Sequence, residues 1–217
     1  MRAQGLICVV TDRTRLAPSE PLTQQLRSLV RQARAAAVAG ADLLQIREPG
    51  LPDALLYRLV EDCREQTLDS SMAIVVNDRL DIALAAGADG VHLKESSIPI
   101  LEARRLAPEH FLVSVSVHDP KAAGVASRAG ADFVIFGTMF PTASKAHGHV
   151  TASLEGLAAA VAASTVPVLA IGGIDHRHVA DVARVAAGVA AIGWFATTDE
   201  RRLTDVVRQA RSSFDSA

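Results

Sequence analysis

Ala39-Gly40-Ala41-Asp42 runs directly into the apolar stretch Leu43-Leu44-Gln45-Ile46, and the same phrase recurs along the chain. It returns at residues 86–89 and 129–132, and a weaker copy lies at residues 187–193. Each copy follows an alanine-rich stretch with helical spacing, and its glycine suits the left-handed cap of a helix. The apolar run behind it is typical of a strand buried on both faces. The repeat therefore predicts helices that alternate with parallel strands.

Four more apolar runs complete the set, at residues 6–10, 73–76, 112–115 and 168–171. With the helical segments between them they give eight strand–helix units of the length that such a unit requires. We therefore expect an α/β fold, a (β/α)8 TIM barrel, with residues 1–217 as a single domain. A doubly wound sheet is the alternative. Eight units in 217 residues, and the lack of a G-x-G-x-x-G motif after the first strand, favour the barrel.

Composition narrows the class of partner. The chain is 49% hydrophobic and 21% charged, with a net charge of -2, so it lacks the basic field that binds nucleic acid. Its apolar runs are shorter than the roughly 20 residues of a membrane span, and the first is too short for a secretory signal. Cys8 and Cys63 have no motif spacing and are expected to be reduced core residues. We expect a cytoplasmic protein that binds neither nucleic acid nor membrane.

Polar side chains collect where the predicted strands end. Arg47, Asn77, Asp78, Lys94 and Ser116 all follow or close apolar runs. In a TIM barrel the carboxyl ends of the strands share one face, so these side chains should line a single pocket. Strand ends are often polar simply because loops meet water. That explanation accounts poorly for an arginine, a lysine and an Asn-Asp pair beside buried strands.

The last two strands end in glycines, at Gly172-Gly173 and at Gly193-Trp194. Glycine lets backbone N–H groups approach an oxyanion closely, and a helix start behind it adds a positive dipole end. This pair of loops is a frequent phosphate site in TIM barrels. The alternative is that the glycines only make tight turns. Combined with the repeat, they predict a phosphate-binding site.

The segment after the sixth strand, residues 138–150, is long for a compact barrel and is expected to act as a lid. Thr142 and Ser144 offer hydroxyl groups and Lys145 a compact charge, which suits an anionic leaving group. His147 and His149 have no third partner in the pattern, so we assign them no metal.

At these residues the chain resembles the thiamine phosphate synthase/TenI family, from about Leu6 to beyond Trp194. The motifs that carry the resemblance are QIRE at 45–48, VNDR at 76–79, ADGVHL at 88–93, SVSVH at 114–118, FPTASK at 140–145 and AIGGI at 170–174. The resemblance implies a barrel that handles hydroxyethylthiazole phosphate. Synthases of the family join it to aminomethylpyrimidine diphosphate and release pyrophosphate with Mg²⁺. TenI proteins instead aromatise a thiazole phosphate carboxylate tautomer or have no clear activity.

The resemblance also implies roles for residues of this chain. The diphosphate would be bound by Arg47, Asn77, Ser116, Thr142, Ser144 and Lys145. The thiazole phosphate would lie at Gly173 and the Gly193 turn, next to Gly172 and Trp194 of the predicted phosphate site, and Mg²⁺ would be held by Asp78.

Three positions depart from the family pattern. Pro49 stands where synthases carry a lysine, and Lys94 is the candidate to replace that positive charge. Ser97 stands where synthases carry the second Mg²⁺ carboxylate, and Glu95, two residues away, is the candidate to supply the missing oxygen. Thr138 replaces the TenI-type histidine, so a tautomerase would need His118 or His92 as its base.

We therefore predict a thiamine phosphate synthase that acts on small-molecule substrates. A homo-oligomer is compatible with this prediction. A TenI-like tautomerase and a non-catalytic phosphate-binding barrel remain the alternatives.

Overall fold

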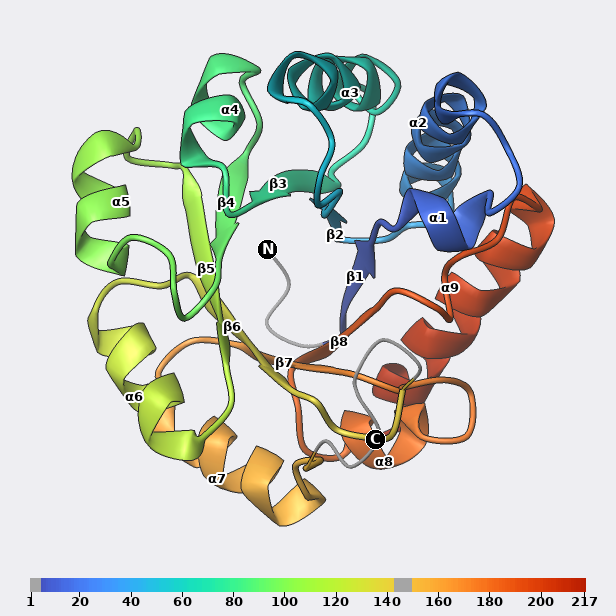
Figure 1. Cartoon of the computed structure of the whole chain (residues 1–217). Helices are drawn as coiled ribbons and strands as arrows, with labels where there is room; N and C mark the ends of the chain where they lie inside the picture. Colours follow the sequence, from blue (N-terminus) through green and yellow to red (C-terminus); the bar gives the residue numbers. More distant parts are fainter. Residues whose placement is uncertain (1–4, 143–149) are drawn as a thin grey trace.

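The computed structural model describes residues 5–142 and 150–217, and within them the strands close into a parallel barrel. In chain order the strands are β1 (Leu6–Val10), β2 (Leu43–Ile46), β3 (Ala73–Asn77), β4 (Gly90–Leu93), β5 (Leu112–Val117), β6 (Phe133–Gly137), β7 (Val168–Ile171) and β8 (Gly188–Ala191). Each pairs with the next in sequence, and β1 closes the ring against β8 (Figure 1). The predicted (β/α)8 barrel is confirmed, and the doubly wound sheet is excluded.

The helices form a ring around the strands (Figure 1). They are α1 (Arg13–Leu16), α2 (Leu22–Val38), α3 (Asp53–Glu65), α4 (Leu80–Ala85), α5 (Ile100–Leu106), α6 (Pro120–Arg128), α7 (Leu154–Ala163), α8 (Val179–Ala183) and α9 (Glu200–Asp215). The short α1, which the repeat did not predict, follows β1 because the Asp12 carboxylate accepts the N–H groups of Thr14 and Arg15. Over residues 5–142 and 150–217, no helix is long and apolar enough to cross a membrane.

The repeated glycine has the conformation that the sequence predicts. Gly40, Gly87 and Gly130 have φ of 84°, 66° and 95°, the left-handed region that closes a helix. The weaker fourth copy differs, and the cap prediction is wrong there: Gly188 is the first residue of β8. A Cβ atom at Gly188 would come within 2.3 Å of the Leu6 carbonyl oxygen, so this glycine allows close strand pairing.

The repeated aspartate ties neighbouring strands together at their amino ends. In each full copy its Oδ2 accepts the backbone N–H of the preceding strand: Asp42 from Ile7 at 2.8 Å, Asp89 from Ile74 at 2.7 Å and Asp132 from Val113 at 2.7 Å. The repeat thus encodes a strand clasp as well as a helix cap, which the sequence analysis missed.

Two apolar layers fill the molecule. Alternate strand residues point inward, as Leu6, Cys8 and Val10 do in β1, and they fill the barrel interior together with Phe133 and other strand residues. The remaining strand residues pack against the helices. Cys8 and Cys63 are buried and unbonded, as predicted, and burial raises the pKa of the Cys8 thiol to about 12. Because the interior is packed, the pocket described next lies at the carboxyl ends of the strands.

Candidate active site at the mouth of the barrel

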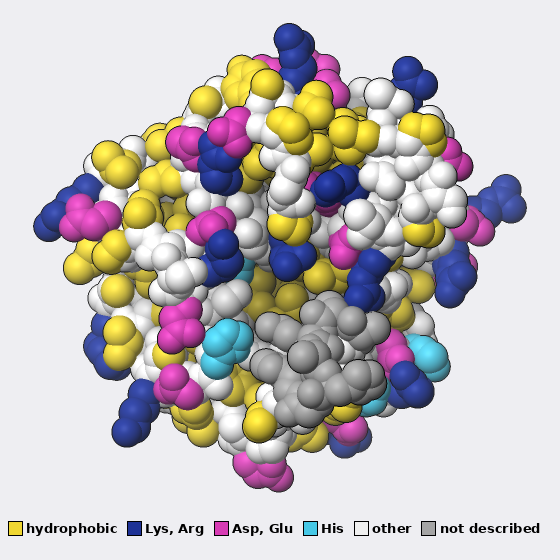
Figure 2. Space-filling view, viewed as in Figure 1, with side chains coloured by type: hydrophobic (Ala, Val, Ile, Leu, Met, Phe, Trp, Pro, Cys, Tyr) yellow, Lys and Arg dark blue, Asp and Glu magenta, His cyan; other side chains and the backbone are white. Residues whose placement is uncertain are grey.

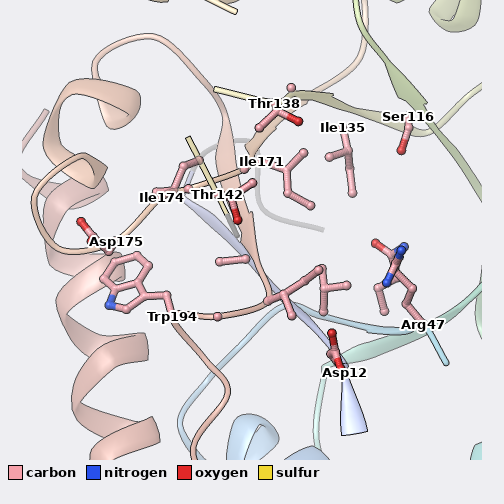
Figure 3. A pocket seen from close by; sticks show the side chains of 18 of the residues that line it. Asp12, Arg47, Ser116, Ile135, Thr138, Thr142, Ile171, Ile174, Asp175 and Trp194 are labelled. Atoms are coloured by element: carbon pink, nitrogen blue, oxygen red, sulfur yellow. The ribbon is translucent and has the colours of Figure 1, made fainter. Parts of the chain in front are cut away.

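A pocket of about 1110 Å³ opens where the strands end. Val10, Ile135 and Ile171 contribute apolar side chains to it, and polar residues from all parts of the barrel line the rest. Figure 2 shows the hollow with hydrophobic side chains at its bottom and Lys and Arg side chains on its rim. In Figure 3, Arg47 and Ser116 lie on one side of the pocket, and Ile174 and Trp194 on the other. The predicted site face is therefore a pocket with two polar sides.

Arg47 is positioned by a clamp between the ends of β2 and β1. Its backbone N–H donates to the buried Thr11 hydroxyl at 2.9 Å. The next residue, Glu48, is buried and pairs with Arg13 of α1 at 2.9 Å, also accepting the Arg13 backbone N–H. Burial raises the pKa of Glu48, although the hydrogen bonds from Thr11 and Arg13 oppose this shift. The clamp leaves the Arg47 guanidinium at the pocket wall (Figure 3), where it can bind an anion.

Gln45 and Asn77 form a polar pair beside Arg47. The Gln45 Nε2 donates to Asn77 Oδ1 at 2.9 Å, and both residues line the pocket. Gln45 is buried, and its Oε1 has no hydrogen-bond partner among the described residues. A buried amide oxygen without a partner can accept a hydrogen bond from a ligand N–H that reaches it. A glutamine near the end of an apolar strand is the sequence signal for this position.

Ser116 is held by His92 on the neighbouring strand. The ring nitrogens of His92 contact two hydroxyls: Nδ1 lies 2.9 Å from Ser114 Oγ, and Nε2 lies 2.8 Å from Ser116 Oγ. Burial, together with the charge of Arg47, lowers the pKa of His92 to about 4. His92 is therefore neutral near pH 7 and orients Ser116 at the pocket wall. Both of its nitrogens are occupied, which weakens His92 as a catalytic base.

The predicted metal ligand Asp78 is paired within the protein. Lys94 forms an ion pair with its Oδ2, and the Ser97 hydroxyl donates to its Oδ1. The backbone N–H of Lys94 donates to Ser97 Oγ at 2.7 Å, which closes the cluster. Glu95 is exposed on the pocket rim and is not among the recorded partners of Asp78. We name these residues, Asp78, Lys94 and Ser97, the Asp78 cluster.

The opposite side of the pocket is built by the loops after β7 and β8. Gly172 and Gly173 have φ of 103° and 65°, and added Cβ atoms would collide with Thr138 and Phe140. These two glycines are therefore required by the backbone itself. The expected helix starts lie further along the chain, because α8 begins at Val179 and α9 at Glu200. Any anion here would meet turn N–H groups instead of helix ends.

Arginine side chains that the sequence analysis missed also line this side. Arg15 lies over Gly193, so that a Cβ atom there would be 3.3 Å from Arg15 Nη1. Arg177 and Arg202 line the pocket too, although Arg177 is paired with Asp175 at 2.6 Å. Arg15 belongs to helix α1, which has no counterpart in the repeat, so the repeat does not predict its position at the pocket.

Thr142 lines the pocket beside the loop after β7, on the side of Ile174 (Figure 3). The backbone of Phe140 donates to the Gly172 carbonyl, so this segment runs beside that loop. Ser144, Lys145, His147 and His149 lie outside the described residues. Within residues 5–142 and 150–217 there is no group of three His, Cys, Asp or Glu side chains that could hold a metal ion.

Fold and site together define a TIM-barrel protein of the enzyme type, with a closed parallel barrel and polar groups around the mouth. The family model for thiamine monophosphate synthase matches residues 7–194. The chain belongs to this family.

Relatives and solved structures agree with the family assignment. Thiamine-phosphate synthase of Methanoculleus marisnigri is 42% identical over 186 residues, 85% of this chain and 87% of that protein. Thiamine-phosphate synthase of Methanoregula boonei is 44% identical over 156 residues, 72% of each chain. The structure of thiamine phosphate pyrophosphorylase from Pyrococcus furiosus superposes with a TM-score of 0.80 at 30% identity, covering 97% of this chain and 96% of that one. A 3-hexulose-6-phosphate synthase, at 19% identity and a TM-score of 0.69, shares the fold.

Proposed function

We propose that the protein is a thiamine phosphate synthase that couples hydroxyethylthiazole phosphate to aminomethylpyrimidine diphosphate. The bond between the pyrimidine methylene carbon and the diphosphate oxygen breaks, and its electron pair leaves with pyrophosphate. The thiazole nitrogen then supplies the electron pair for the new bond to that carbon. The observation that carries this proposal is a pocket with an Arg47–Asn77–Ser116 side and a Gly173–Gly193 side, in a chain of this family.

On the first side, the groups match a pyrimidine that carries a diphosphate. The Gln45 Oε1 lacks a described partner and can accept a hydrogen bond from an exocyclic amino group. Arg47, Asn77 and Ser116 can stabilise negative charge as it builds up on the leaving pyrophosphate. Thr142, beside the loop after β7, is proposed to add a hydroxyl on the strength of the family resemblance. Ser144 and Lys145 are proposed to take part as well, on the strength of the family resemblance.

On the second side, the thiazole phosphate is proposed to rest against the turns at Gly172-Gly173 and Gly193-Trp194. Arg15 supports this placement, because its guanidinium lies directly over Gly193 and a phosphate beside that glycine would receive a charge-assisted hydrogen bond. The thiazole ring would then face the pocket centre and the bound pyrimidine.

Magnesium is the cofactor that the family implies, with Asp78 and Glu95 as the proposed ligands. The described residues do not fit a metal ion held by the protein: both Asp78 oxygens are engaged by Lys94 and Ser97, and Glu95 is not joined to them. The steps proposed above therefore involve only the two substrates and side chains of the protein.

The test is to identify the product made by the purified protein. It is incubated with both substrates, or with the thiazole phosphate carboxylate tautomer alone, and analysed by mass spectrometry. We expect thiamine phosphate from the first mixture. Conversion of the tautomer alone would instead favour the tautomerase, with His118 as base, since its Nδ1 bonds to the Gly137 carbonyl and Nε2 is left as an acceptor. No conversion in either mixture would favour the non-catalytic barrel.

A further inference from the structure

We infer that the Lys94 ammonium supplies positive charge at the diphosphate end of the pocket. It occupies the position beside Asp78 that a metal ion would otherwise take. The inference rests on the proposed synthase function. It goes further by assigning the positive charge at this end of the pocket to a side chain of the protein itself.

The contacts of the Asp78 cluster carry the inference. The Lys94 ammonium binds one carboxylate oxygen of Asp78 and the Ser97 hydroxyl binds the other, so a metal ion at Asp78 would have to compete with a partner at each oxygen. The backbone N–H of Lys94 donates to Ser97 Oγ at 2.7 Å, which holds the loop after β4 in the conformation that brings both groups to Asp78. The loop therefore favours the lysine over a metal ion as the cation beside Asp78.

Lys94 is the cation that pairs with Asp78, because the neighbouring Arg79 pairs with other carboxylates. Arg79 is adjacent to Asp78 in sequence, but its guanidinium is engaged by Asp81 at 2.6 Å and by Asp53. The ion pair with Lys94 balances the negative charge of the Asp78 carboxylate.

The position of Lys94 also suits contact with a leaving group. Lys94 lines the pocket, as Arg47 and Asn77 do, and its side chain is 51% exposed. A lysine has three donors on a flexible stem, so its ammonium can keep one contact with Asp78 and direct another to a diphosphate oxygen. A divalent ion bound to Asp78 would place two cations side by side, and like charges repel. Lys94 and a protein-held metal ion should therefore exclude one another.

The first test measures metal binding directly. Mn²⁺ alone is titrated into the full chain and its unbound fraction is followed by electron paramagnetic resonance, for the native protein, Lys94→Met and Lys94→Met/Ser97→Asp. We expect weak binding by the native protein, binding at least about tenfold tighter in Lys94→Met because Asp78 is released, and a further gain when Ser97→Asp adds a carboxylate. Lys121→Met, which removes an exposed lysine from α6, is the matched control and should bind as the native protein does.

Equal Mn²⁺ affinity in the native protein and in Lys94→Met would overturn the inference. Circular dichroism checks that the variants are folded, and Lys94→Gln serves as the second variant if the methionine variant is not.

The second test follows thiamine phosphate formation with excess chelator or with Mg²⁺. We expect the native protein to lose less than about threefold in kcat/KM under chelation, and Lys94→Met to lose activity in chelator and to regain part of it with Mg²⁺. A native protein that is active only with Mg²⁺ would contradict the inference while leaving the synthase function intact. A protein that makes no product under any condition would contradict the proposed function, and the Mn²⁺ titration would still decide whether Lys94 occupies the cation position.

Discussion

At the scale of single residues, Arg15 shows how a small local feature can shape the site. Asp12 caps the one-turn helix α1, and the cap places Arg15 over Gly193 on the far side of the pocket. A weak contact to Asp12, at 3.5 Å, leaves most of the donors of the Arg15 guanidinium available to a ligand. Arg15 can thus donate hydrogen bonds to the thiazole phosphate in the proposed reaction.

Replacing Arg15 by alanine should raise the KM for the thiazole phosphate by roughly 10- to 100-fold, the loss of one charge-assisted hydrogen bond, with little change in kcat. The measurement is steady-state kinetics with each substrate varied in turn. Arg31→Ala, on the exposed face of α2, removes the same charge outside the pocket and should leave both KM values unchanged. A larger rise in the KM for the pyrimidine substrate would contradict the placement of Arg15 beside the thiazole phosphate.

At the scale of elements, the aspartate clasps and the buried histidine join strands at opposite ends of the barrel. Asp132 accepts the Val113 N–H at 2.7 Å and also pairs with Arg104 of α5, so it ties β5 and β6 at their amino ends. His92 joins β4 to β5 near the pocket through two serine hydroxyls. Each contact can be tested separately.

Substituting Asp132 by alanine should lower the free energy of unfolding by about 1–3 kcal/mol, because the Val113 N–H loses its acceptor inside the structure. Urea denaturation measures this change. Asp69→Ala, at an exposed position, is the control for loss of a charge. Catalytic activity at 25 °C should be retained, because the clasp lies at the end of the barrel away from the pocket; equal stability of native and variant proteins would refute the clasp.

The lowered pKa of His92 predicts how stability depends on pH. Burial disfavours the charged imidazole in the fold, and nearby Arg47 adds to this while Asp78 opposes it. Between the ordinary pKa of about 6.5 and the folded value of about 4, the unfolded chain binds more protons, so the free energy of unfolding should fall as pH falls through this window. The contribution is at most about 3 kcal/mol.

Urea titrations at several pH values, compared with His92→Gln, would measure the His92 contribution. A slope that is the same in both proteins would show that His92 is not its source.

The repeat made the barrel predictable because three copies share a cap glycine and a following strand. The fourth copy lacks the aspartate, and its glycine begins β8 instead of ending a helix, a difference that depends on contact with Leu6 across the barrel. In the site, strand ends predicted which side of the barrel carries Arg47, Asn77 and Ser116. The pairing of Lys94 with Asp78 depends on a loop conformation set by Ser97, and such tertiary contacts cannot be derived from spacing along the chain.

At the scale of the whole molecule, the barrel separates stability from chemistry. The amino ends of the strands carry the clasps, the packed interior fills the middle, and the carboxyl ends carry the pocket. The pocket is wide enough, at about 1110 Å³, to hold two substrates at once. Arg47 and Ser116 lie on one side of the pocket and Trp194 on the other (Figure 3), which agrees with the two anion sites proposed for the reaction.

The most direct test of this account is whether both anions bind together. Inorganic pyrophosphate is titrated by calorimetry into the protein, first alone and then saturated with hydroxyethylthiazole phosphate. A synthase with two anion sites on opposite sides of one pocket should bind pyrophosphate in both cases, with similar or tighter affinity when the thiazole phosphate is present. Competition between the two ligands for a single site would contradict the account, because a barrel with one phosphate site cannot hold both substrates of the proposed reaction.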